Sequence, residues 1–402
     1  MKITLDDMKK AREVINGVAR KTPVEISVAA SQIVGSQVFL KCENLQLTGS
    51  FKIRGALYKI SSLSDAERKR GVLAVSAGNH AQGVALSSSK LGVKATVVMP
   101  RTSSMMKQTA TRNYGADVIL HGETYDEAYE YALEFKKKSG LVFVHPFEDP
   151  YIIAGQGTVG LEIHEDLSAT DSVIVPIGGG GLISGIAVAL KALKPSIKVY
   201  GVVAENAPGM FSLFNKHKVS ANVSGISIAD GIAVKKPSAF MFDNFISKYV
   251  DDVMAVSEDE IAEAIVFLLE RSKIVAEGAG AVALAAAFQK KWNLGEKTVL
   301  LVSGGNIDLH LVGEILDRGL SRKGRVTRIS VVVTDRPGTL SKLTKIIGDM
   351  GANILDVNHD RLHPSLQVRE ALISFVLETR DSAHAEEIRC AFQQAGVRLG
   401  SQ

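Results

Sequence analysis

Cysteine and long apolar runs are scarce in this sequence. Cys42 and Cys390 are the only cysteines among 402 residues, and they lie far apart. Two such thiols do not make a disulfide framework, which favours a reducing, cytoplasmic location. No apolar stretch approaches the ~20 residues that cross a bilayer. Polar residues interrupt the N-terminal apolar positions, so we expect an amphipathic helix there, with no signal peptide and no membrane partner.

An excess of charge of one sign is also absent. The chain carries 47 Lys and Arg against 43 Asp and Glu, a net charge of +4, with both signs interspersed. This balance gives no support to nucleic acid as a partner. Hydrophobic residues make up 46% and charged residues 22%, which is typical of a globular protein. The length predicts two or three domains.

What is present is a regular alternation of short β-branched runs with helical patterns. Continuous apolar strands separated by helices indicate parallel sheets that are covered on both faces, and so a doubly wound α/β architecture. The predicted strands are 38–42, 72–76, 95–100, 117–121, 142–145, 172–178, 198–204 and 298–305. The clearest predicted helices are 81–92, 124–140 and 258–272.

The alternation stops at "SRKGRV" (321–326), a polar run that we interpret as a linker. The residues after it predict the order strand, helix, strand, strand, helix, strand, which is the ferredoxin-like βαββαβ arrangement. We therefore expect an α/β body over 1–320 and a small α+β domain over 327–402.

A run of four glycines, Gly178, Gly179, Gly180 and Gly181, joins a predicted strand to a helix that begins near Leu182. Converging backbone N–H groups and a helix N-terminus suit a phosphate. The spacing matches neither of the common nucleotide-binding glycine patterns. The alternative is a plain strand-to-helix turn, although four glycines carry an entropic cost that such a turn does not require.

Three other stretches contain candidate functional residues. Lys52 lies in "GSFKIRGA" (49–56), where a partly desolvated amine could condense with an aldehyde. Asn79 lies in "SAGNHAQG" (76–83) and Ser303 in "SGGN" (303–306), both directly after predicted strands, where doubly wound sheets bind ligands. Taken singly, these residues could be a solvated lysine, a helix N-cap and a turn serine.

Together, the four motifs "GSFKIRGA", "SAGNHAQG", "GGGGL" and "SGGN" resemble, in order and spacing, the serine/threonine dehydratases (threonine ammonia-lyases) of pyridoxal-phosphate fold type II. The resemblance covers residues ~5–320. It implies two doubly wound α/β subdomains, the smaller one, about 45–145, being inserted in the larger. The tail, with its Asp-Arg-Pro-Gly loop, resembles an ACT regulatory domain.

The resemblance also implies roles for individual residues. Lys52 would hold the aldehyde of pyridoxal 5'-phosphate as a Schiff base and then take the substrate's Cα proton. Asn79 would bond the 3' oxygen of the ring, and Ser303 would face the ring nitrogen. The phosphate would lie on Gly178, Gly179, Gly180, Gly181 and Leu182. The substrate carboxylate would be received by Ser50, Ser76 and neighbouring N–H groups such as that of Gly78.

The expected reaction is β-elimination, which converts L-threonine to 2-oxobutanoate and ammonia, with L-serine giving pyruvate. Serine racemases resemble this chain but place a serine where it has Ala77, which cannot donate a proton. Their metal site pairs a Glu with an Asp six residues on, whereas here Glu205 is followed at that spacing by Phe211, so we expect no metal. A β-replacement enzyme and a non-catalytic amino-acid sensor are further alternatives.

The tail domain is expected to bind an amino-acid effector at the loop after its first strand. That loop contains Asp335 and Gly338, and Asn353 is expected to lie across from it. Isoleucine or valine, as end products of isoleucine and valine biosynthesis, are the natural candidates. A pairing module without a ligand is the alternative. The resemblance implies a homodimer or homotetramer.

Overall fold

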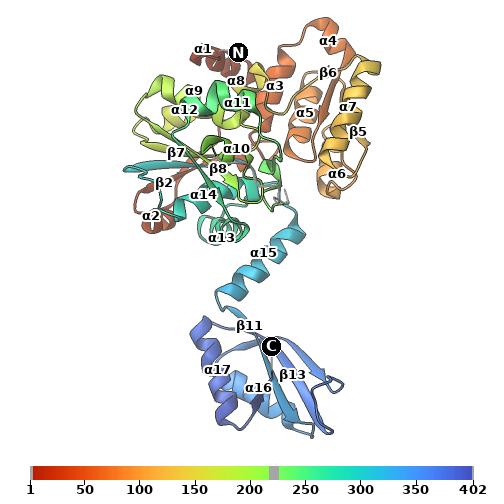
Figure 1. Ribbon diagram of the computed structural model, residues 1–402, viewed down its shortest axis with the longest axis vertical. Coiled ribbons are helices and arrows are strands. Elements are labelled where there is room, and N and C mark those ends of the chain that lie inside the picture. Colours follow the sequence, from red (N-terminus) through yellow and green to blue (C-terminus); the bar gives the residue numbers. More distant parts are fainter. Residues whose placement is uncertain (1–2, 217–225, 401–402) are drawn as a thin grey trace. The chain divides into compact units, whose positions relative to one another are not determined.

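The computed structural model describes residues 3–216 and 226–400. The chain divides into two compact units, Met1–Asp308 and Leu309–Gln402 (Figure 1). No helix within the described residues has both the length and the apolar character needed to cross a bilayer.

The larger sheet of the first unit has six strands in the order β1-β2-β10-β7-β8-β9. The five strands β2 to β9 in this order are parallel, and β1 pairs with β2 antiparallel. The strands are β1 (Val24–Ile26), β2 (Gln37–Cys42), β7 (Ser172–Pro176), β8 (Lys198–Ala204), β9 (Asp252–Val256) and β10 (Lys297–Val302). The sequence prediction missed β1 and β9 and placed the others to within a few residues.

Helices cover both faces of this sheet. On one face, α9 (Gly181–Leu193) shares a core with the inward residues of β7, β8 and β10. On the other, α14 (Gly278–Phe288) contacts β7 to β10. The remaining helices of this part are α1 (Leu5–Ile15), α2 (Val28–Val34), α8 (Pro150–Asp166), α10 (Gly209–Phe214), α11 (Ala239–Met241), α12 (Ser247–Tyr249) and α13 (Glu258–Phe267).

The smaller sheet is inserted between β2 and β7 and has the parallel order β5-β4-β3-β6. Its strands are β3 (Val72–Val75), β4 (Ala95–Met99), β5 (Asp117–Leu120) and β6 (Val142–Phe143). Its helices are α3 (Lys52–Ser61), α4 (Asp65–Arg70), α5 (Asn79–Lys90), α6 (Met105–Asn113) and α7 (Tyr125–Ser139). Val72 and Ala74 pack in the core with α5, and Leu73 and Val75 pack in the core with α7. Both faces are therefore buried, as predicted for a doubly wound sheet.

The second unit confirms the βαββαβ order. Its elements are β11 (Val326–Thr334), α16 (Thr339–Asp349), β12 (Asn353–Asp360), β13 (Glu370–Glu378), α17 (Ser382–Gln394) and β14 (Arg398–Leu399), and the sheet order is β12-β13-β11-β14. Both helices bury their apolar residues against one face of β11 and β13.

The division between the two units differs from the predicted one. Helix α15 (Leu309–Arg322) groups with the second unit and contacts β11, so the unit begins at Leu309 and not after residue 320. The first two residues of the predicted linker, Ser321 and Arg322, are the last residues of α15. The prediction weighed the glycine and the charges of 321–326, whereas the helical pattern before them continues through Arg322.

Candidate active site

A cavity of about 550 Å³ lies between the two sheets of the first unit. It is lined by the loops that follow β3, β7 and β10, together with the start of α3 and residues 230–236. The carboxyl ends of parallel strands are where doubly wound sheets bind ligands. Of the predicted catalytic, cofactor and substrate residues, Lys52, Ser76, Gly78, Asn79, Gly178, Gly179, Gly180, Gly181, Leu182 and Ser303 line this cavity.

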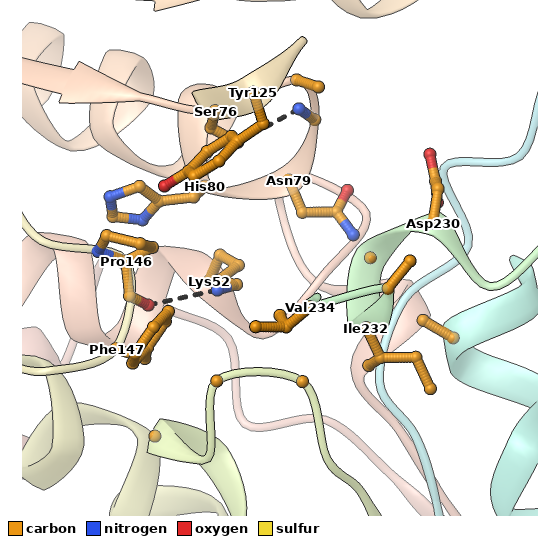
Figure 2. Close-up of a pocket in the computed structure, with 18 of the residues that line it drawn as sticks. Lys52, Ser76, Asn79, His80, Tyr125, Pro146, Phe147, Asp230, Ile232 and Val234 are labelled. Atoms are coloured by element: carbon orange, nitrogen blue, oxygen red, sulfur yellow. Dashed lines mark hydrogen bonds between the residues drawn. The ribbon is translucent and has the colours of Figure 1, made fainter. Parts of the chain in front are cut away.

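Lys52 is the first residue of α3, and its amine points into the cavity (Figure 2). Nζ donates a hydrogen bond to the carbonyl oxygen of Pro146 at 3.2 Å and lies 5.3 Å from the ring centroid of Phe51. Burial lowers the pKa of Lys52 to about 8, and the carboxyl group of Glu277 opposes this shift only in part. About one amine in ten is therefore unprotonated at pH 7, which suits a nucleophile or a base.

The four glycines form the turn between β7 and α9. Gly180 has φ +97°, a conformation that favours glycine, and a Cβ on Gly179 would lie 2.1 Å from the ring of Phe147. No side chain caps α9, so its first N–H groups have no intrahelical acceptor. A phosphate group would bind these N–H groups and benefit from the helix dipole.

Ser303 follows β10 and is 2% exposed. Its hydroxyl donates to the carbonyl oxygen of Ala279 at 3.2 Å, a long bond that it could exchange for a bond to a ring nitrogen. The amine, the uncapped helix end and this hydroxyl are the donor set that pyridoxal phosphate needs for its aldehyde, its phosphate and its ring nitrogen. The residues present therefore fit this cofactor.

Asn79 differs from the simplest expectation for it. Gly78 occupies the N-cap position of α5, and Asn79 is the first helical residue, without a capping hydrogen bond. Its amide instead donates to Glu277 Oε1 at 2.6 Å and accepts from Asn306 Nδ2 at 2.8 Å. Figure 2 shows Asn79 and Val234 on one side of Lys52, with Pro146 and Phe147 on the other.

Ser50 is placed differently from the other predicted substrate residues. It is fully buried, does not line the cavity, and forms a backbone bridge with Gly304. Its hydroxyl has no hydrogen-bond partner among the described residues. Ser76 does line the cavity, and its Oγ accepts a hydrogen bond from the Gly78 N–H at 3.1 Å.

Two histidines near Lys52 are neutral structural groups. The His80 ring bonds to the carbonyl oxygen of Val144 at 2.9 Å, and burial lowers its pKa to about 3. His145 accepts the N–H of Glu148 on Nδ1 at 2.8 Å, and burial lowers its pKa as well.

The sequence prediction missed several residues of the cavity wall. Glu277, at the N-terminus of α14, is 3% exposed, and burial raises its pKa to about 7. Lys107 of α6 forms an ion pair with Asp230, which joins the smaller subdomain to the larger one at the cavity. Asn306 belongs to a motif that the prediction used, but it was given no role. No sequence signal joins these residues, because each is distant in the chain from its partner.

The second unit brings only part of the predicted effector set together. Asp335, after β11, accepts a hydrogen bond from Arg361 Nε at 2.7 Å, and Gly338 begins α16 with φ +87°. Asn353 lies at the other end of the sheet: it pairs with Glu378, which pairs with Val326, whereas Thr334 pairs with Glu370. The expectation that Asn353 faces this loop is therefore wrong within one chain, because α16 carries the chain back along the sheet.

Comparison with known proteins agrees with this geometry. Residues 15–305 match the model for pyridoxal-phosphate dependent enzymes. The chain belongs to this family. Residues 327–392 match the ACT domain, so the second unit is an ACT domain preceded by α15.

Individual relatives are close to this member of the family over most of its length. It is 51% identical to L-threonine ammonia-lyase of Thermotoga maritima over 386 residues, which is 96% of each chain. A solved threonine deaminase, from the source abbreviated T.th., superposes with a TM-score of 0.71 at 39% identity, covering 76% of this chain and 99% of that one. Maize serine racemase superposes with a TM-score of 0.74 at 33% identity, covering 80% and 99%.

Proposed function

We propose that this protein is a threonine ammonia-lyase, which converts L-threonine to 2-oxobutanoate and ammonia and takes L-serine, giving pyruvate, as a second substrate. The observation that carries the proposal is a lysine with a pKa of about 8 in one cavity with the uncapped start of α9 and Ser303. The names of the relatives support the choice of substrate.

When bound, pyridoxal phosphate supplies an aldehyde that captures the substrate amine and a ring that accepts the electron pair of the Cα–H bond. Lys52 first carries the cofactor. Once the substrate amine has replaced it, its free amine takes the Cα proton, and its lowered pKa makes this possible near neutral pH. The β-hydroxyl leaves as water, and hydrolysis of the released enamine gives the keto acid and ammonia.

Two side chains favour elimination over the alternatives. Ser303 is a neutral hydroxyl and cannot keep the ring nitrogen protonated as a carboxylate would, so the negative charge is short-lived and the adjacent hydroxyl is expelled. Ala77 lines the cavity beside Gly78, and its methyl group has no proton to return to Cα. Serine racemisation, which the maize neighbour's title names, is therefore the second candidate.

Regulation, assembly and location form the finer part of the proposal. We infer that the ACT domain binds a branched-chain amino acid near Asp335 and Gly338 and transmits an allosteric effect to the catalytic unit. Such coupling requires the effector to bind two states of the enzyme unequally. We also infer a cytoplasmic homotetramer or homodimer that acts in isoleucine biosynthesis, the location being supported by the scarcity of cysteine.

The decisive experiment combines colour with product identification. The purified protein should absorb at the violet edge of the visible spectrum, lose this band in Lys52→Ala, and form 2-oxobutanoate from L-threonine. A colourless wild type that stays colourless with added cofactor would indicate a non-catalytic sensor. D-serine as the main product from L-serine would establish the racemase instead.

Regulation has its own test. Deletion of residues 326–402 should abolish any effect of isoleucine or valine on keto-acid formation. Inhibition that persists after the deletion would place the effector site outside the ACT domain.

A further inference from the structure

Glu277 is a buried carboxyl group in the cavity wall, and the mechanism above gives it no task. Only 3% of the residue is exposed. A carboxyl group this deep in a protein is costly unless it serves a partner. Its partner here is the amide of Asn79, at 2.6 Å from Oε1.

The hydrogen bonds around Asn79 have only one possible direction. The chain of bonds starts at the carbonyl oxygen of Thr48, which can only accept, so it fixes the Asn306 Nδ2 group as the donor at 2.7 Å. The same Nδ2 donates to Asn79 Oδ1 at 2.8 Å, so the amide nitrogen of Asn79 must face Glu277. One N–H of Asn79 is then bonded to Glu277, and the second has no partner among the described residues.

Two glycines of the functional motifs leave room for this chain of bonds. A Cβ on Gly49 would lie 2.3 Å from Asn306 Oδ1. A Cβ on Gly304 would lie 2.3 Å from Glu277 Oε1. Side chains at these positions would displace Asn306 and Glu277 respectively. The glycines of "GSFK" and "SGGN" thus have a specific steric role at the site.

We propose that Glu277 is a positioning residue for the cofactor: its carboxyl group fixes the Asn79 amide so that the remaining N–H is presented to the phenolic oxygen of pyridoxal phosphate. The inference rests on the proposed function only for the use of this cofactor, and it holds for any reaction on it. Lys52, Lys107 and Asp230 are the charged groups whose fields reach Glu277. With burial as the largest cause, they leave its pKa near neutral, so a neutral amide in its place is a small change.

A double-mutant cycle on cofactor affinity tests this inference. The dissociation constant of pyridoxal phosphate is measured by absorbance titration of the full-length, cofactor-free protein. Glu277→Ala should weaken binding about tenfold, as expected for a lost positioning hydrogen bond. In an Asn79→Ala background the same change should weaken it less than about twofold, because Glu277 acts through Asn79. Equal effects in both backgrounds, or unchanged affinity in Glu277→Ala, would overturn the proposal.

Conservative and control variants complete the design. Glu277→Gln keeps an acceptor for the Asn79 N–H and should restore affinity to within about threefold of wild type; failure of this rescue counts against the proposal. If the alanine variant does not fold, Glu277→Leu replaces it in the cycle, since leucine fills the space without accepting a hydrogen bond. Glu258→Gln, a carboxyl change at a residue that does not line the cavity, should leave affinity unchanged.

The outcome is separable from that of the proposed function. A protein that binds the cofactor but forms no keto acid from threonine would refute the threonine ammonia-lyase, yet the cycle would still decide the role of Glu277.

Discussion

Arg54 lies two residues after Lys52 and is the centre of a fully buried ionic cluster behind the cavity. Its Nε and Nη2 donate to the two carboxylate oxygens of Glu43, both at 2.8 Å, and Nη1 donates to Glu162 at 2.6 Å. Lys41 Nζ also donates to Glu162, at 2.6 Å. Two cations and two carboxylates give the cluster no net charge, and it fixes the start of α3 to β2 and α8.

The perturbation is Arg54→Met, which keeps the volume and removes the cation. The cluster then carries one unpaired negative charge in a region where Arg54 was 1% exposed. Loss of one partner of a buried ion pair costs about 3–5 kcal/mol. We therefore expect the free energy of unfolding of the catalytic unit to fall by this amount at pH 7, and cofactor occupancy to fall with it because α3 carries Lys52.

The assay is urea unfolding of the holoenzyme followed by tryptophan fluorescence. Trp292 is the only tryptophan of the chain and stacks on Tyr200 in the catalytic unit, with ring centroids 4.5 Å apart. Its signal therefore reports the unfolding of this unit and not of the ACT domain. Arg12→Met removes the ion pair with Glu165 at the surface and serves as the control, with an expected loss of under about 1 kcal/mol.

Charge balance supplies the rescue. Glu43→Gln together with Arg54→Met leaves the neutral Lys41–Glu162 pair, so the double variant should be more stable than Arg54→Met alone. A loss below about 1 kcal/mol in Arg54→Met, or a double variant that loses the sum of both single changes, would refute the reasoning.

The same cluster predicts a pH dependence. Burial alone would raise the pKa of Glu43, but Arg54 more than offsets this and holds it below the ordinary value of 4.5. A carboxyl group with a lowered pKa stabilises the fold above pH 4.5 and loses this contribution as the pH falls. The deficit of Arg54→Met should therefore be largest near pH 7 and shrink below pH 4.5.

Three further predictions concern the cavity. Since the pKa of Lys52 is about 8, the rate at which cofactor-free protein captures pyridoxal phosphate should rise about tenfold from pH 6 to 7 and level off above 8; a flat profile would contradict this. Gly304→Ala should weaken cofactor binding at least about tenfold by displacing Glu277, whereas Gly348→Ala in α16, where no atom lies within 4 Å of the new Cβ, should leave it unchanged. Lys107→Met, by opening the ion pair at the cavity, should raise KM for threonine about fivefold with a smaller change in kcat; the reverse pattern would contradict a binding role.

The sequence by itself determined the architecture and the central site. The alternation of apolar strands with helices is a local pattern, and it correctly predicted the two parallel sheets and the βαββαβ domain. The four motifs follow strand ends or begin helices, and parallel strands carry such positions to one edge. That is why Lys52, Asn79, the glycine loop and Ser303 could be predicted to meet.

Only the tertiary structure decided how these residues are supported. Asn79 and Glu277 are 198 residues apart in the chain, and their hydrogen bond depends on how the two subdomains pack. The register of β11, β12 and β13 separated Asn353 from Asp335, and the helical continuation through Arg322 moved the boundary between the units. Arg54 looked like a surface cation in the sequence, but it is buried because Glu43 and Glu162 reach it from other elements. Local patterns specify which element a residue occupies, whereas its partners depend on contacts between distant segments that form only when the whole unit folds.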